Sequence, residues 1–153
     1  MEVLNKPHLL VIGGTGFIGH HLLVATRDDY QVTSVSLNAP CPQRFVDSVR
    51  YLQLDIRDIN AVKMALSDGY DYVVNLGGYI DHRLFSNGGH ALIDEHFLAL
   101  QNLILALSRK SLRCFVQIGS SDEYGMSPAP QVEDLREQAI SPYSFAKLAS
   151  THL

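Results

Sequence analysis

The sequence is short of cysteine, of clustered positive charge and of long apolar runs. Its 153 residues include only two cysteines, Cys41 and Cys114, which form no Cys-x-x-Cys pair, so nothing predicts a disulfide framework. Lysine and arginine number 12 against 16 acidic residues, and no basic run stands out. We therefore expect no nucleic-acid partner. The first apolar run, residues 9–12, is too short for a signal peptide or a membrane span, so we expect no membrane association and a cytoplasmic location.

What is present is an ordinary globular balance. Hydrophobic residues make up 46% of the sequence and charged residues 18%, which argues against disorder. The length is sufficient for one domain with its own core. We therefore treat residues 1–153 as a single domain.

Short apolar runs alternate with helix-compatible segments along the chain. Strands are expected at residues 8–12, 31–37, 49–54, 72–76 and 113–118. Helices are expected at residues 17–26, at 58–66 with Asp58 as N-cap, at 91–109, and after Ser141 with Pro142 in the first turn. This alternation predicts βαβ units and hence an α/β fold with a Rossmann-like, doubly wound parallel sheet.

Four of the expected strands end in glycine or polar segments. These segments are residues 13–19, 55–56, 77–78 and 120–121. Ligands of such sheets bind at the carboxyl ends of the strands, so the four segments are expected to border one crevice.

The glycine-rich turn at residues 13–19 directly follows the first strand and opens a helix, which is the context of a dinucleotide-binding turn. Gly13 permits a tight turn, Gly16 lets the backbone approach a pyrophosphate, and Gly19 allows close packing of helix on strand. The helix N-terminus then offers free N–H groups and a partial positive charge to the anion. The alternative, glycines that only make a turn, is the weaker interpretation in this context.

Two further positions leave their roles open. The second strand ends in Ser36-Leu37-Asn38, with neither the acid typical of NAD sites nor the arginine typical of NADP sites, so the cofactor is NAD or NADP. Asp55 either accepts a hydrogen bond from an adenine amine or serves only as a turn residue.

Five motifs occur in an order that resembles the extended short-chain dehydrogenase/reductase family, in its NAD-dependent epimerase/dehydratase branch. They are Gly-Gly-Thr-Gly-Phe-Ile-Gly at 13–19, Asp-Ile-Arg-Asp at 55–58, Asn-Leu-Gly-Gly at 75–78, Gly-Ser-Ser-Asp-Glu-Tyr-Gly at 119–125 and Ser-Pro-Tyr-Ser-Phe-Ala-Lys at 141–147. The resemblance covers the whole chain and implies a nicotinamide cofactor and, most often, a nucleotide-sugar substrate. It implies cofactor contacts from Gly13, Gly16, Phe17, Ile18, Gly19, Ser36, Asp55, Ile56, Leu76, Gly77, Gly78, Tyr143 and Lys147.

Tyr143 and Lys147 stand four residues apart, so on a helix they share one face. A free phenol has a pKa of about 10, but a neighbouring ammonium and an oxidised nicotinamide favour the phenolate. Tyr143 is therefore predicted to take a proton from a sugar hydroxyl while hydride leaves the same carbon. The resemblance also implies that Lys147 binds the nicotinamide ribose. For this pair in isolation, a packed tyrosine with a solvated lysine would be the simpler interpretation.

The resemblance also implies roles for the segment after the fifth strand. Ser120 is expected to orient the reacting oxygen, with Ser121 as the fallback. Asp122 stands where related dehydratases carry an acid that moves a proton at the neighbouring carbon, and a one-residue shift would make Glu123 the second acid. These acids tilt the prediction toward elimination or reduction, while a solvated loop stays an equal alternative.

Two positions depart from the family pattern. Gly77-Gly78 replaces the usual pair of alanines, and His96 stands where an asparagine is usual. The seven histidines have no carboxylate spacing that supports a metal site, so we expect no metal.

Together these features predict a nucleotide-sugar epimerase/dehydratase-type oxidoreductase. The family is about twice this length, so we expect the C-terminal substrate-binding part to be absent and the chain alone to lack activity in that case. The alternatives are an NAD(P)-binding module or truncated non-catalytic homologue, and an NADPH-dependent ketone reductase. In the family, the long helix and the Tyr/Lys helix form a homodimer interface. The apolar face of residues 92–107 fits that interface and fits a buried core helix equally well.

Overall fold

Five short apolar segments form one parallel sheet in the computed structural model, which describes residues 6–153. The strands are β1 (His8–Ile12), β2 (Gln31–Ser36), β3 (Val49–Gln53), β4 (Tyr72–Asn75) and β5 (Cys114–Gln117). Their order is β3-β2-β1-β4-β5, and every neighbouring pair is parallel. This is the doubly wound order, so the predicted Rossmann-like fold is confirmed. Each strand begins and ends within one residue of its predicted limits.

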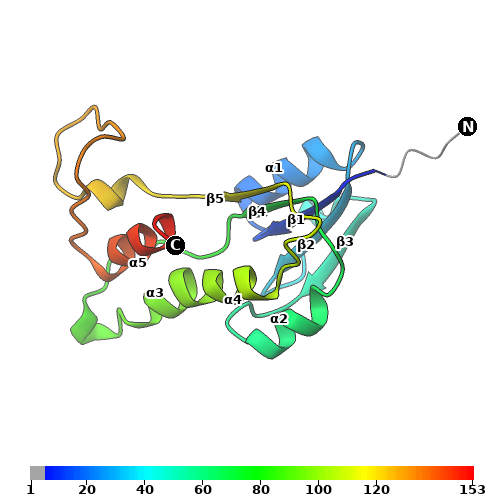
Figure 1. Cartoon of the computed structure of the whole chain (residues 1–153), viewed down its shortest axis with the longest axis horizontal. Coiled ribbons are helices and arrows are strands. Elements are labelled where there is room, and N and C mark those ends of the chain that lie inside the picture. Colours follow the sequence, from blue (N-terminus) through cyan, green and yellow to red (C-terminus); the bar gives the residue numbers. More distant parts are fainter. Residues whose placement is uncertain (1–5) are drawn as a thin grey trace, which may run out of the picture.

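Helices cover both faces of the sheet (Figure 1). On one face lies α1 (Phe17–Thr26), and on the other lie α2 (Ile59–Ala65) and α4 (Ala99–Ala106). Successive strand residues point to opposite faces, and β1 supplies both cores. Its Leu9 and Val11 pack in the cluster that holds Leu23 of α1. Its Leu10 and Ile12 pack in the cluster that holds Val62, Leu66, Leu103 and Leu107. Burial on both faces explains why β1 reads as an unbroken apolar run.

The long helix predicted at residues 91–109 contains a change of helix type. It begins as α3 (Ala91–Ile93), continues as the π-helical segment η3 (Asp94–Leu98) and ends as α4 at Ala106. A π-turn adds one residue to a turn, and the apolar pattern did not reveal it. The helix therefore lies where it was predicted, but it is not a regular α-helix throughout.

The last part of the chain lies beside the α3 end of this helix (Figure 1). After β5 comes a short 3₁₀ turn, η4 (Ser121–Tyr124), then a loop, then α5 (Pro142–Thr151). α5 packs against α3, η3 and η4. Its predicted cap is confirmed: the Ser141 hydroxyl accepts from the backbone N–H of Ser144 at 3.0 Å, and Pro142 occupies the first helical position. Among residues 6–153, no helix has the length and apolar character needed to cross a bilayer.

The Asp58 cap of α2 gives a first test. Its Oδ1 accepts from the backbone N–H groups of Asn60 at 2.9 Å and Ala61 at 3.1 Å, as predicted for an N-cap. D58A leaves both donors without this partner, so we expect the free energy of unfolding to fall by about 1 kcal/mol in urea titrations. D58N keeps an acceptor oxygen and should lose much less. Equal midpoints for D58A and the wild type would show that the cap contributes nothing.

Candidate functional site

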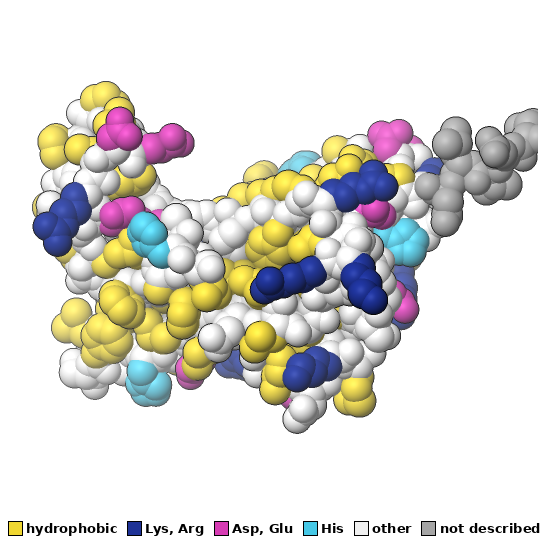
Figure 2. Space-filling model, viewed as in Figure 1, with side chains coloured by type: hydrophobic (Ala, Val, Ile, Leu, Met, Phe, Trp, Pro, Cys, Tyr) yellow, Lys and Arg dark blue, Asp and Glu magenta, His cyan; other side chains and the backbone are white. Residues whose placement is uncertain are grey.

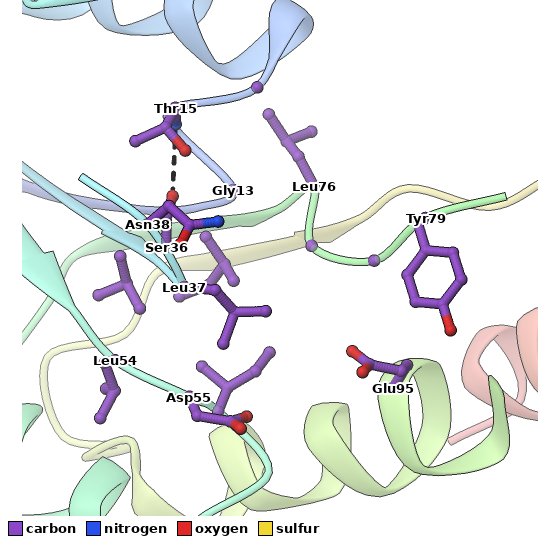
Figure 3. A pocket seen from close by; sticks show the side chains of 16 residues that line it. Gly13, Thr15, Ser36, Leu37, Asn38, Leu54, Asp55, Leu76, Tyr79 and Glu95 are labelled. Atoms are coloured by element: carbon purple, nitrogen blue, oxygen red, sulfur yellow. Dashed lines mark hydrogen bonds between the residues drawn. The ribbon is translucent and has the colours of Figure 1, made fainter. Parts of the chain in front are cut away.

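A cavity of about 300 Å³ opens at the carboxyl ends of β1, β2, β3 and β4 (Figure 3). Eight of the predicted contact residues line it: Gly13, Gly16, Ser36, Asp55, Ile56, Leu76, Gly77 and Gly78. Three of the four segments predicted to converge therefore do so. The fourth, residues 120–121, does not line this cavity, and neither do Phe17, Ile18, Gly19, Tyr143 and Lys147.

The glycine turn has the close backbone approaches that its sequence predicts. Gly13 has a φ of +79°, and a β-carbon there would lie 3.0 Å from the carbonyl oxygen of Leu76. A β-carbon on Gly19 would overlap the carbonyl oxygen of Gly13, so the start of α1 can rest directly on the turn only with glycine there. No side chain caps α1 at Gly16, which leaves N–H groups of its first turn free for an anion. The turn therefore fits a pyrophosphate.

Phe17 and Ile18 direct their side chains away from the protein, since they are 70% and 62% exposed. Any contact they make with an anion at the turn is therefore made through their backbone N–H groups. The ring of Phe17 packs edge to face on His21 of the same helix, with the ring centres 4.9 Å apart.

The cavity wall at the end of β2 is polar and uncharged. The backbone N–H of Thr15 donates to the hydroxyl of Ser36 at 3.3 Å, and Asn38 lies beside them (Figure 3). A second cavity of about 190 Å³ is also lined by these three residues. The structure adds one cation near this wall: Nη1 of Arg44 donates to the carbonyl oxygen of Thr15 at 3.2 Å.

Asp55 is engaged by a neighbouring cation. Its carboxylate accepts from Nε of Arg57 at 2.9 Å and from Nη2 at 2.6 Å, and the backbone N–H of Arg57 donates to it at 2.9 Å. The Arg57 guanidinium lowers the pKa of Asp55. Arg57 also donates to Glu95 at 2.8 Å, so it pairs with both acids that line the cavity. An anion bound in the cavity would thus face no unpaired carboxylate. The turn role of Asp55 is visible, and its adenine contact stays a prediction.

Tyr143 and Lys147 lie on the same face of α5 and are both buried, with exposed fractions of 6% and 5%. The Lys147 ammonium donates to the carbonyl oxygen of Ile118, two residues before Ser120. Burial lowers the pKa of Lys147, and the nearby carboxylate of Glu123 opposes that shift. The alternative of a merely solvated lysine is therefore wrong.

Ser120 begins η4 as its N-cap. Its hydroxyl oxygen accepts from the backbone N–H of Asp122 at 3.2 Å, and its own N–H donates to Oε1 of Glu123 at 2.7 Å. Glu123 is only 5% exposed and is engaged in this capping box, so it is not available as a second acid. Asp122 is partly exposed, and its Oδ2 lies 3.6 Å from Nδ1 of His82.

Two histidines flank the ring of Tyr143. The His82 ring lies 5.7 Å from it at 77°, and the His96 ring lies 5.1 Å from it at 82°, both edge to face. His82 comes from the loop after β4, and no spacing in the sequence could place it here. His96 stood out only as a departure from the family pattern.

Tyr79 joins the cavity to this second group. It lines the cavity together with Glu95, and the two lie at one end of it (Figure 3). Its carbonyl oxygen lies 3.0 Å from Nε2 of His96. The structure therefore brings together a cradle for an anionic ligand and, beyond Tyr79, a cluster of Tyr143, Lys147, Asp122 and the two histidines.

Comparison with known proteins gives one family and many similar folds. A family model described as the NAD dependent epimerase/dehydratase family matches residues 9–153. No curated protein matches the chain.

Three solved structures illustrate the similar folds. A UDP-galactose 4-epimerase is 25% identical with a TM-score of 0.80, over 94% of this chain and 48% of its own. The UDP-glucose 4-epimerase of Thermus thermophilus, in complex with NAD, is 22% identical with a TM-score of 0.81, over 95% and 49%. The uronate dehydrogenase of Agrobacterium tumefaciens is 21% identical with a TM-score of 0.77, over 97% and 55%. The chain thus spans about half the length of these structures.

The uncharged end of β2 allows a test of cofactor choice. S36D keeps an oxygen that can accept from Thr15 and adds a negative charge to the cavity wall. We expect the ratio of NADP affinity to NAD affinity, measured by calorimetry, to fall at least about tenfold, because the charge repels a 2′-phosphate and can bond a 2′-hydroxyl. S36N, which adds no charge, is the matched control. An unchanged ratio in S36D would mean that the ribose lies elsewhere.

The buried ammonium of Lys147 makes stability depend on pH in a defined direction. Its folded-state pKa is lowered, so the unfolded chain holds this proton more tightly. The free energy of unfolding of the wild type, relative to K147M, should therefore rise between the lowered pKa and the ordinary pKa of about 10.4. Urea titrations at neutral pH and near pH 10 measure the difference.

K63M, which removes an exposed lysine of α2, measures at the same two pH values what the loss of any lysine contributes. A K147M difference that does not grow with pH beyond the K63M difference would contradict the burial of the ammonium.

Proposed function

The chain belongs to the NAD dependent epimerase/dehydratase family, and on that premise we propose that it forms the cofactor-binding half of an NAD(P)-dependent oxidoreductase that acts on nucleotide sugars. The observation that carries the proposal is the buried pair of Tyr143 and Lys147 on one face of α5. Burial of an ammonium is costly, and such a group usually serves function rather than stability. The glycine turn supplies the accompanying anion cradle.

NAD(P), when bound, supplies a hydride acceptor and donor for a sugar carbon. The free N–H groups at the start of α1 would hold its pyrophosphate, and Lys147 would hold its nicotinamide ribose. Tyr143, as phenolate, would take the proton of the hydroxyl group borne by the carbon that loses hydride. The ammonium of Lys147 favours that ionised form.

Ser120 is suited to orient the reacting oxygen. Its hydroxyl oxygen accepts from the N–H of Asp122, which leaves its hydrogen free to donate. Ser121 is exposed and is the fallback for this role.

The step after the first hydride transfer defines the reaction class. An epimerase would return the hydride to the opposite face of the same carbon, and a dehydratase would lose water from the substrate before the hydride returned. A dehydrogenase would release the reduced cofactor, and a reductase would run that reaction in reverse and release the oxidised cofactor. Asp122 supports proton transfer at the neighbouring carbon, because His82 lies 3.6 Å from its carboxylate and both lie near Tyr143. The similar structures named as 4-epimerases and as a uronate dehydrogenase support the first and the third outcome.

The other class of function is an NAD(P)-binding module, or a truncated homologue without turnover. It would use the same glycine turn and the free N–H groups at the start of α1 to hold the cofactor. An NADPH-dependent ketone reductase would use the same Tyr143, Lys147 and Ser120, and it differs only in the substrate.

Assembly and location complete the proposal. Exposed apolar residues support a homodimer through the long helix and α5: Leu98 of η3, Leu105 of α4 and Phe145 of α5. Figure 2 shows hydrophobic side chains gathered over α3, α5 and the loops beside them. We propose a cytoplasmic location, consistent with two exposed, unpaired cysteines.

Y143F tests catalysis. The full-length protein is incubated with a panel of nucleotide sugars and with NAD or NADP, and the products are followed by mass and by cofactor absorbance. We expect turnover to fall by about 10²–10⁴-fold in Y143F, because the proton acceptor is lost, while cofactor affinity stays near that of the wild type. Y124F, in the same part of the structure, is the matched control.

The product identifies the reaction class: an isomer of equal mass, a product lighter by one water, or net cofactor reduction or oxidation. Wild-type cofactor binding without any turnover would favour the binding module. Equal turnover in Y143F and the wild type would contradict the proposed mechanism.

A further inference from the structure

The His96 ring lies directly against the backbone of Gly78. A β-carbon on Gly78 would overlap Cε1 and Nδ1 of the ring and lie 3.1 Å from Nε2. Gly78 also has a φ of +110°, which side chains rarely tolerate. Two independent constraints therefore require glycine at position 78: the positive φ and the space that the His96 ring occupies.

His96 holds the next residue of the same loop. Its Nε2 lies 3.0 Å from the carbonyl oxygen of Tyr79, and because a carbonyl can only accept, this nitrogen carries the hydrogen. Burial lowers the pKa of His96, the bond to the Tyr79 carbonyl opposes this shift, and the charge of Lys147 adds to it. The net direction is downward, so the imidazole is neutral at neutral pH. The neutral tautomer is fixed by this one bond.

Two further contacts of His96 are with α5. Its ring packs edge to face on Tyr143, and its carbonyl oxygen accepts from the hydroxyl of Ser150 at 3.1 Å. His96 thus touches the loop that lines the cavity and the helix that carries Tyr143 and Lys147. It lies in the middle of η3, and π-turns often occur at functional sites.

The opposite end of the loop is fixed to the sheet. Oδ1 of the buried Asn75 accepts from the N–H of Gly77 at 3.0 Å, and Nδ2 of Asn75 donates to Gln117 of β5 at 2.8 Å. The segment Gly77–Tyr79 is therefore held by Asn75 at its start and by His96 at its end. Only the His96 contact continues into α5.

We propose that His96 is a positioning residue that couples the cofactor-binding segment Gly77–Tyr79 to Tyr143, and that Gly78 is its obligate partner because it leaves room for the ring. The proposal rests on the function proposed above and names two residues that set the distance between cofactor and proton acceptor. His96 acts through the backbone of Tyr79 and the ring of Tyr143, and it needs no contact with substrate.

The first test follows Tyr143 directly. Tyrosines are labelled with ¹³C at the ring, and the Tyr143 signal among the seven is assigned with Y143F. In the wild-type chain, saturating NAD should change the Tyr143 chemical shift. In H96A and H96F we expect that change to shrink to about half or less, although NAD is again saturating. H96F keeps an aromatic ring in the space but cannot donate to Tyr79.

H8A is the matched control. His8 Nδ1 lies 3.2 Å from the carbonyl oxygen of Gly69, so this variant removes an imidazole–carbonyl contact of the same kind outside the site. It should leave the Tyr143 response to NAD unchanged.

The second test is a double-mutant cycle on NAD affinity, measured by calorimetry for the wild type, G78A, H96A and the double variant. We expect G78A to weaken binding at least about tenfold when His96 is present and about threefold or less in the H96A background, because the overlap with the ring is then gone. The strain that alanine meets at the positive φ of residue 78 is the same with and without His96. It therefore cancels from the coupling free energy of the cycle.

The outcomes separate the two proposals. If the wild type binds neither NAD nor NADP, or if neither of them changes the Tyr143 chemical shift, the proposed function fails. If Tyr143 responds to NAD equally in the wild type and H96A, the positioning role of His96 is overturned while the function stands. Additive effects of G78A and H96A would overturn the partnership with Gly78. Where G78A does not fold, the comparison of H96A, H96F and H8A still decides the role of His96.

Discussion

The structure depends on the burial of β1 on both faces. A strand covered on both sides needs helices above and below, and right-handed crossovers then carry the chain to β2 on one side and to β4 on the other. The order reverses at β1, so the loops after β1 and β4 part and leave the cavity between them. The place of the site therefore follows from four apolar residues, 9–12, whose exposed fractions are all 4% or less.

Much of this was predictable because the signals are local. Apolar runs gave the strands, and the Tyr-x-x-x-Lys spacing placed Tyr143 and Lys147 on one helical face. The caps at Asp58 and Ser141 also follow from residue type at a helix start. What spacing could not predict was burial. Residue spacing gives the relative orientation of two side chains on a helix, but it does not say what the helix packs against. The contact of Lys147 with the carbonyl oxygen of Ile118 was therefore found only in the structure.

The sequence after β5 contains a capping-box signal that distinguishes its two acids, and the prediction of their roles did not use it. Asp122 and Glu123 look alike in a polar segment, but Ser120 and Glu123 have the Ser-x-x-Glu spacing of a capping box. That spacing turns Glu123 inward and leaves Asp122 at the surface beside His82. The position of His82 had no local signal at all, because it depends on how a loop of no regular structure returns to α5.

The two halves of the site differ in how they are supported. The cavity is built on strand ends, which a buried sheet holds rigidly, whereas α5 rests on α3, η3 and η4. The distance between the anion cradle and Tyr143 is therefore not set by the sheet alone. Lys147 ties α5 to the end of β5 through Ile118, and His96 ties it to the end of β4 through Tyr79. Two buried nitrogen donors, one on Lys147 of α5 and one on His96 of η3, thus bond to carbonyl oxygens that follow neighbouring strands. The position of the Tyr143 phenol relative to the cavity therefore depends on backbone carbonyls as much as on side-chain packing.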